Sequence, residues 1–141
     1  MSRLTLAQAN KIIEVAFAKA REMKVKPLAV AVLDESGNVR SLQRQDEASM
    51  LRNEVAIGKA WAAVGMGVSS AVLLERAKGN PSFFGALSAT SRGRFIPQTG
   101  AVVIKDKDGT ILGAAGASGG TGEEDEAVCI AGIEAAGLVS G

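Results

Sequence analysis

The chain has 141 residues, a formal net charge of +1, and a composition that is 47% hydrophobic but only 4% aromatic. Its length predicts one domain, residues 1–141, with a core of aliphatic side chains. Because no stripe of basic residues stands out, we expect neither nucleic acid nor a membrane as a partner. Histidine is absent, which excludes histidine-based triads and histidine ligands to a metal or to haem from this chain.

The number of cysteines and the length of the apolar runs indicate in which cellular compartment the protein is expected. Cys129 has no second cysteine with which to form a disulfide. It lies within an apolar helical pattern, so we expect a buried structural residue rather than a catalytic thiol. No signal peptide or membrane-spanning stretch is apparent, and the expected location is the cytoplasm.

The first part of the chain predicts a helix followed by a hairpin. Thr5 and Gln8 form a capping-box pattern, and apolar residues recur at helical spacing over 6–24. The apolar run 28–33 predicts a strand that is buried on both faces. A polar turn then returns the chain as a second strand over 39–44.

A second helix is predicted over 50–64, and it carries one unusual charge. Lys59 is the only charged residue between Glu54 and Glu75, so this helix is apolar nearly all round and should be buried. The Lys59 side chain then either extends to water or points into a cavity that holds a counter-charge or an anionic ligand. Burial would favour its uncharged amine, which can act as a base.

The remaining pattern predicts helices over 70–78 and 81–89, strands over 101–105 and 110–117, and a final helix from 122 to about 136. Without the short irregular helix over 81–89, the elements follow the order α-β-β-α-α-β-β-α. This order predicts an α/β chain of the α+β type, in which helices cover a mixed, mainly antiparallel sheet.

Small and acidic residues meet where the last strand enters the final helix. Residues 113–126 read GAAGASGGTGEEDE, and such a run of glycine indicates a tight turn or the close approach of a backbone or a ligand. Thr121 and Glu124 form a second capping box. The free amides of the helix N-terminus attract anions, although the acidic first turn competes with them. The alternative interpretation is a well-capped helix packed tightly on a strand.

Several segments, in their order, resemble the GlcG/HbpS family, which includes the C-terminal domain of PduO-type proteins. They are LAVAVLDESGNV, RQD, IGKA and DGTILGAAGASGGT, with the EEDE helix that follows. The resemblance covers nearly the whole chain. It implies a profilin-like fold, assembly of identical subunits into dimers or larger rings, and binding of a small ligand, which is haem in some members and has been linked to corrinoids in others.

The resemblance also implies a pocket. The predicted ligand-binding residues are Arg44, Thr99, Gly100, Ser118, Gly119, Gly120 and Thr121, and the catalytic candidates are Lys59, Asp46 and Glu123. Thr99 departs from the glycine-rich loop that is usual before the third strand, and its hydroxyl implies a different ligand. No metal site is predicted: Glu123 and Glu126 have the spacing of an iron-binding pair, but acidic residues are common in a first helical turn.

These residues support four interpretations. The leading one is a binding domain that holds a small anionic molecule between Lys59, Arg44 and the glycine turn. The second is a cofactor-independent isomerase, lyase or hydrolase acting on a small oxo or hydroxy acid in a catabolic pathway. In that enzyme Lys59 would polarise or deprotonate the substrate, and Asp46 or Glu123 would transfer protons.

The third interpretation is a haem-binding or sensing protein. Because histidine is absent, its iron would depend on Met50, Met66 or an oxygen ligand. The fourth is a purely structural assembly protein, since apolar faces on an alanine-rich chain favour homo-oligomers. The sequence itself does not identify a cofactor.

Overall fold

The computed structural model describes residues 3–141 and has the predicted α+β class. Its elements are α1 (Leu6–Met23), β1 (Ala29–Asp34), β2 (Val39–Arg44), α2 (Leu51–Met66), α3 (Ser70–Gly79), α4 (Pro81–Thr90), β3 (Ala101–Lys105), β4 (Ile111–Ser118), α5 (Gly122–Ala135) and β5 (Val139–Ser140). The predicted order is confirmed, and β5 is an addition. This strand pairs with the end of β3 and is too short to produce a periodic sequence pattern.

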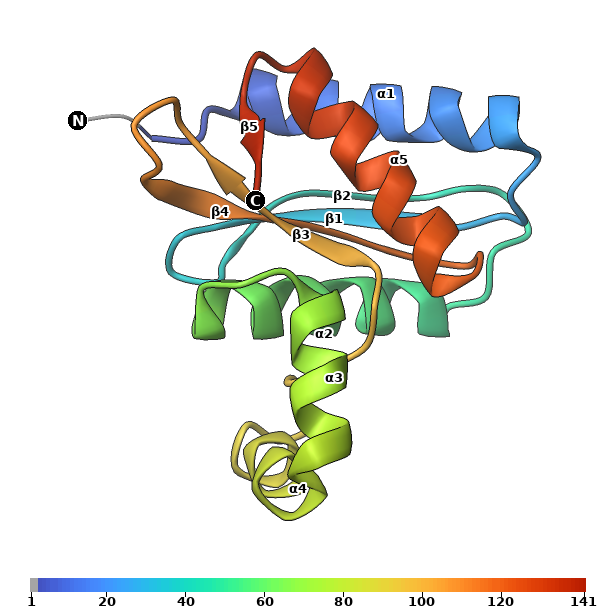
Figure 1. The fold of residues 1–141 in the computed structure, drawn as a ribbon. Coiled ribbons are helices and arrows are strands. Elements are labelled where there is room, and N and C mark those ends of the chain that lie inside the picture. The colour runs from blue at the N-terminus through green and yellow to red at the C-terminus, as the bar shows by residue number, and fades with distance from the viewer. Residues whose placement is uncertain (1–2) are drawn as a thin grey trace.

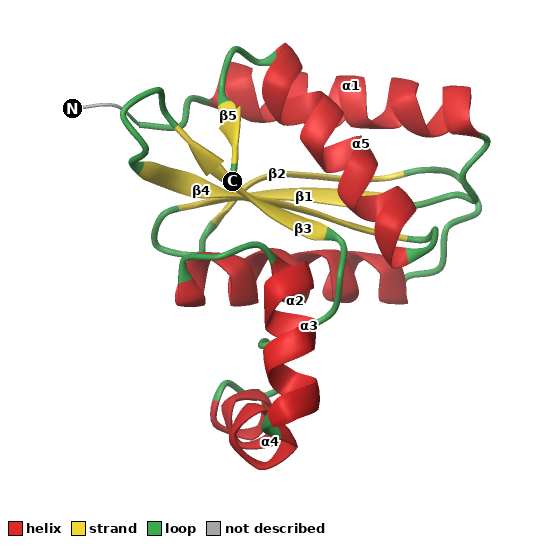
Figure 2. Ribbon diagram, viewed as in Figure 1, coloured by secondary structure: helices red, strands yellow, loops and turns green. Residues whose placement is uncertain are grey.

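The strands form one antiparallel sheet of order β2-β1-β4-β3-β5 (Figure 2). The two predicted hairpins, β1–β2 and β3–β4, lie side by side through β1 and β4. In this register Ala29 is opposite Ser118, and Ala101 is opposite Gly116. The start of β1, the end of β4 and the start of β3 therefore lie at the same end of the sheet.

Helices cover both faces of the sheet, with α1 and α5 on one face and α2 on the other (Figure 1). The strand β1 is apolar from Ala29 to Leu33, and the packing of its side chains explains why. Val30 and Val32 pack in the cluster that contains α1 and α5, whereas Ala31 and Leu33 pack toward α2. Successive strand side chains point to opposite faces, so a strand covered on both sides is apolar at every position.

A glycine lets α2 lie very close to β4. A Cβ atom added to Gly116 would be 2.4 Å from the carbonyl oxygen of Ala56 and 3.1 Å from the Cβ of Ala60. No side chain fits at that distance, so the short gap between α2 and β4 depends on glycine at this position. Because α2 approaches so closely, side chains from its inner face can reach the end of β4.

The helices α3 and α4 project from α2 on the side away from the sheet (Figure 1). They are joined to α2 by a cluster that contains Ala62, Leu73, Phe84 and Phe95. The rings of Phe84 and Phe95 are 6.0 Å apart. Phe83, the neighbour of Phe84, is 50% exposed, so this arm leaves an aromatic side chain partly in solvent.

Within residues 3–141, no helix taken singly has the length and hydropathy to cross a membrane. Only α2 and α3 taken together reach that length and hydropathy, and they are bent by 80° where they meet.

Candidate functional site

The turn between β4 and α5 has the capping geometry that its sequence predicts. The Thr121 hydroxyl accepts a hydrogen bond from the Glu124 amide at 3.1 Å, and the Glu124 carboxylate accepts one from the Thr121 amide at 2.9 Å. The helix α5 therefore begins at Gly122. In the described part of the chain, the amides of Gly122 and Glu123 have no hydrogen-bond acceptor, as is usual for the first residues of a helix.

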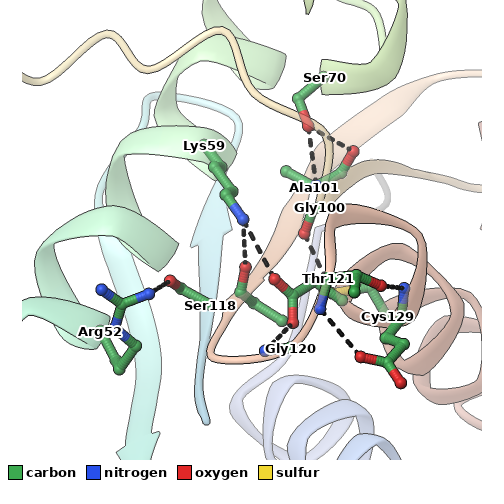
Figure 3. A network of polar contacts seen from close by, with 12 residues as sticks. Arg52, Lys59, Ser70, Gly100, Ala101, Ser118, Gly120, Thr121 and Cys129 are labelled. Atoms are coloured by element: carbon green, nitrogen blue, oxygen red, sulfur yellow. Dashed lines mark hydrogen bonds and ion pairs between the residues drawn. The ribbon is translucent and has the colours of Figure 1, made fainter. Parts of the chain in front are cut away.

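Lys59 reaches this turn from α2. Its ammonium group donates to the Ala117 carbonyl at 3.1 Å and to Asp125 Oδ2 at 3.2 Å (Figure 3). Lys59 is only 6% exposed, so it does not extend to bulk water. The counter-charge expected for a buried lysine is thus supplied by the first turn of α5.

Asp125 connects α2, α5 and the glycine turn. Its Oδ1 atom accepts a hydrogen bond from the Gly120 amide at 3.0 Å, while Oδ2 faces Lys59. The residue is 1% exposed. Burial raises the pKa of the Asp125 carboxyl above its ordinary value, and the Lys59 ammonium and the Gly120 amide oppose that rise without cancelling it.

Gly100 makes room for the Lys59 ammonium. Its φ is 136°, and a Cβ atom there would lie 2.6 Å from Lys59 Nζ and 3.1 Å from the Ala117 carbonyl oxygen. Ala101 follows Gly100 in the chain, and its amide donates a hydrogen bond of 2.8 Å to the Ser70 hydroxyl at the start of α3 (Figure 3). Glycine is therefore required at position 100 by backbone conformation and by packing against the ion pair.

A hollow of about 370 Å³ opens beside the ion pair, within the range of roughly 300–1,000 Å³ that is typical of small-molecule sites. Its wall is formed by α2, α3, the loop before β3 and the turn into α5. Polar residues on the wall are Arg52, Lys59, Gln98, Thr99, Ser118, Glu123 and Asp125, with Val55 and Leu74 as its apolar part. Arg52 Nη1 donates to Ser118 Oγ at 2.9 Å (Figure 3).

Half of the predicted site residues line this hollow together. They are Lys59, Thr99, Ser118, Gly120 and Glu123. These residues come from α2, the loop before β3, the end of β4 and the start of α5. The lysine and the glycine turn therefore share one hollow, as the sequence leads us to expect.

Three other predicted residues lie next to the hollow but do not line it. Gly100 is buried against the ion pair, and Thr121 uses its hydroxyl to cap α5. Gly119 packs against the chain that leads into β1, where a Cβ atom would be 2.4 Å from the carbonyl oxygen of Pro27. Gly119 and Thr121 thus shape the turn itself, whereas Gly100 makes room for Lys59 from the loop before β3.

Arg44 and Asp46 lie elsewhere. They line a separate hollow of about 540 Å³ together with Phe17 and Arg21 of α1, and the Arg44 guanidinium donates to the Ala48 carbonyl. The helix α1 covers the sheet face opposite to α2, so this hollow and the one beside Lys59 are distinct. The expectation that all the predicted groups share one pocket is thereby corrected.

Sequence reasoning missed Arg52, Gln98 and Asp125. A signal for Arg52 exists, because it precedes Lys59 by seven residues, or about two helical turns, and so lies on a similar side of the helix. Asp125 is one of three carboxylates in the first turn of α5. Local sequence does not distinguish among these three, and only the tertiary contact with the Lys59 side chain at the end of the sheet selects Asp125.

Metal-ligating side chains are not assembled in residues 3–141, where no group of three or more histidine, cysteine or acidic residues could hold a metal ion. Glu123 lines the hollow beside Lys59, whereas Glu126 lines another hollow on the side of Ile130. Met50 precedes α2 and is exposed, and Met66 ends α2 and packs with the cluster of the arm. Neither methionine lines the hollow.

Known proteins resemble this chain in sequence and in fold. A protein of 15.0 kDa from the dhaT-dhaS intergenic region of Citrobacter freundii is 30% identical over 125 residues, which cover 89% of this chain and 86% of that protein. The corrinoid adenosyltransferase PduO of Citrobacter freundii is 26% identical over 122 residues, and this chain spans 36% of its length. The crystal structure of a PduOC–haem complex has a TM-score of 0.86 and 25% identity, with 97% of each chain covered.

The fold of this chain is thus the fold of a haem-bound PduOC domain. The family described as haem-degrading protein HbpS-like matches residues 4–134. Because the match extends over most of the sequence, the chain belongs to the HbpS-like family.

Proposed function

We propose that this chain is a small-molecule binding domain, and that its ligand presents a negatively charged group to the hollow beside Lys59 and the Ser118–Gly120 turn. The observation that carries the proposal is the composition of the hollow. Two cationic side chains, Arg52 and Lys59, meet there with the N-terminus of α5 in a space of about 370 Å³.

The wall of the hollow offers several donors to an anion. Arg52 makes one hydrogen bond to Ser118, and its guanidinium has further N–H groups. Thr99 contributes a hydroxyl and Gln98 an amide. The unpaired amides at the start of α5 add the partial positive charge of a helix N-terminus. Charge-assisted hydrogen bonds in such a partly buried space are stronger than hydrogen bonds between neutral groups.

The contacts of Lys59 support binding rather than covalent catalysis. The Lys59 nitrogen donates to Asp125 and to a backbone carbonyl, and the residue is 6% exposed, so the protein itself already engages this group. A nucleophile that attacks a ligand needs a free lone pair with access to that ligand. Of the other catalytic candidates, Glu123 lines the hollow and Asp46 does not.

Calorimetry tests this proposal. Acetate, lactate, pyruvate and inorganic phosphate are titrated into the wild type, into Lys59→Met and into Arg44→Gln, with the fold of each variant checked by circular dichroism. We expect saturable binding of at least one anion that Lys59→Met loses. Arg44→Gln removes a cation from the separate hollow and should bind as the wild type does. Equal binding by the wild type and Lys59→Met would refute the proposal.

Haem is the second candidate, because the similar PduOC structure is a haem complex. Haem carries two propionate carboxylates, and the donors of the hollow can hold one of them. The residues on its wall offer no histidine, methionine or cysteine to the iron, and Cys129 is buried with its sulfur 3.8 Å from the Gly100 carbonyl oxygen. The hollow therefore can hold a carboxylate of haem, but its wall provides none of the usual histidine, methionine or cysteine ligands for the iron.

A comparison of haemin with iron-free protoporphyrin IX tests this second candidate. If the hollow holds a propionate group alone, both compounds should bind saturably and with similar affinity, as measured by their absorption bands. The absence of saturable binding by either compound would remove haem from consideration. Much tighter binding of haemin would show iron coordination, which the wall of the hollow does not account for.

We also propose that the chain forms a homo-oligomer through the arm of α3 and α4. Val72 and Phe83 of this arm are exposed, and the arm projects away from the body of the molecule (Figure 1). Phe83 is 50% exposed on α4, whereas Val72 lines a hollow with Val102 and Ile130 at the base of α3. An exposed aromatic side chain on a projecting element is a common feature of interfaces. Light scattering should give a mass above that of one chain, and Phe83→Ser should lower it. A single-chain mass for the wild type would refute this proposal.

A further inference from the structure

The charged side chains on the wall of the hollow differ in their burial and in their partners. Lys59 and Asp125 are buried and paired at 3.2 Å, so they neutralise each other within the wall. Glu123 is exposed at the rim. This leaves Arg52, which is half-buried, as the cation to consider.

Arg52 has only a neutral side-chain partner. Its guanidinium donates to Ser118 Oγ at 2.9 Å (Figure 3), and among residues 3–141 it forms no ion pair within 4.0 Å. A serine hydroxyl accepts a hydrogen bond but carries no charge. The inner part of the hollow therefore has one uncompensated positive charge, and that charge is on a side chain whose N–H groups match a carboxylate in a two-pronged arrangement.

Glu123 acts in the opposite sense. Its carboxylate lies on the wall of the same hollow, and it repels a second negative charge on any ligand that Arg52 already holds. It can instead accept a hydrogen bond from a hydroxyl group of the ligand. One free cation inside and one anion at the rim together favour a ligand with a single negative charge.

We infer that the ligand of this hollow is a monocarboxylate, that Arg52 binds its carboxylate group, and that Glu123 discriminates against dianions. This inference rests on the proposed binding function and adds the class of ligand and the two residues that select it. Lys59, in this assignment, holds the site together through Asp125, and Arg52 provides the charge that the ligand meets.

Calorimetric titration of propionate and malonate into the wild type tests the ligand class. We expect propionate to bind at least about tenfold more tightly than malonate, since charged hydrogen bonds and like-charge repulsion each correspond to about that factor. Tighter binding of malonate would overturn the inference and leave the proposed binding function intact. If neither anion binds, the monocarboxylate inference is overturned, and the proposed binding function fails as well only if lactate, pyruvate and phosphate also do not bind.

Three variants test the residues. Arg52→Gln should weaken the binding of propionate by at least about tenfold. The affinity of Arg52→Lys should lie between those of Arg52→Gln and the wild type, because lysine keeps the positive charge but cannot donate two parallel hydrogen bonds to a carboxylate. Glu123→Gln should raise malonate affinity several-fold and leave propionate nearly unchanged. Arg44→Gln is the matched control and should alter neither. Unchanged propionate binding in folded Arg52→Gln, or unchanged malonate binding in Glu123→Gln, would refute the role of that residue.

Discussion

The ammonium group of Lys59 lies 3.2 Å from Asp125 Oδ2, and the two side chains are 8% and 1% exposed. The residues are 66 positions apart in the chain and belong to helices on opposite faces of the sheet. Their contact closes the end of the sheet where β4 turns into α5. The stability of the fold and the shape of the hollow therefore depend on the same pair.

Breaking this pair should destabilise the protein strongly. Lys59→Met leaves the buried Asp125 carboxylate without a counter-charge, and we expect a loss of about 3–5 kcal/mol in the free energy of unfolding. Replacing both partners, as in Lys59→Met with Asp125→Leu, removes the unpaired charge and should cost clearly less than the sum of the single changes. Urea denaturation gives the free energy of unfolding of the wild type, of the two single variants and of the double variant. Additive losses would show that the two side chains are not coupled.

The raised pKa of Asp125 predicts a particular pH dependence. Between its ordinary value of about 3.8 and its higher value in the fold, the folded protein binds more protons at this carboxyl than the unfolded chain does. The stability contributed by Asp125 is therefore complete below about pH 3.8 and is lost as the pH rises through the pKa of the folded state. Subtracting the unfolding free energies of Asp125→Asn from those of the wild type isolates this group. The difference should fall with rising pH, and a difference that rises would contradict the prediction.

Two glycine substitutions should have opposite effects. Gly100→Ala places a Cβ atom 2.6 Å from Lys59 Nζ at a φ of 136°, and we expect a loss of about 1–3 kcal/mol in the free energy of unfolding. Gly85→Ala is the matched control, because nothing lies within 4 Å of its Cβ and it is in α4. It should gain about 0.4–1 kcal/mol from helix propensity and reduced unfolded-state entropy. Thermal denaturation compares the two, and equal changes would refute the packing argument at Gly100.

Cys129 should be unreactive in the folded protein. Burial raises the pKa of its thiol, so the reactive thiolate is scarce at neutral pH. We expect a disulfide reagent such as DTNB to react with it slowly in buffer and rapidly in urea. Fast reaction of the native protein would mean that the region around Gly100 and α5 opens readily, which is inconsistent with its burial.

The predictable parts of the fold are those with local signals. Hydrophobic periodicity and the Thr5–Gln8 capping box place α1, and Thr121 with Glu124 places the start of α5. The all-apolar run of β1 correctly indicates a strand covered on both faces. The strand β5 has no such signal, because two residues that pair with β3 make no pattern of their own.

The candidate site was predictable only in part. A lone lysine in an apolar helix and a glycine-rich turn are unusual in any sequence, and the structure places both at one hollow. Arg44 was grouped with them from a motif, but the sheet separates the face of α1 from the face of α2. Arg52 has no distinctive sequence signal, because charged residues are common near the start of a helix. Its importance follows only from the tertiary structure, in which its side-chain partner is a neutral serine.

The sequence by itself determined the α+β class, the order of the main elements and the choice for Lys59 between reaching water and finding a counter-charge. These follow from side-chain periodicity, capping residues and the high free energy of an unpaired buried ion, all of which act over a few residues. Only the tertiary structure decided that Asp125 neutralises Lys59 and that Arg52 is left with a neutral partner. Those outcomes depend on the register of β1 against β4 and on the close approach of α2 at Gly116, and contacts between residues so distant in the chain leave no local pattern.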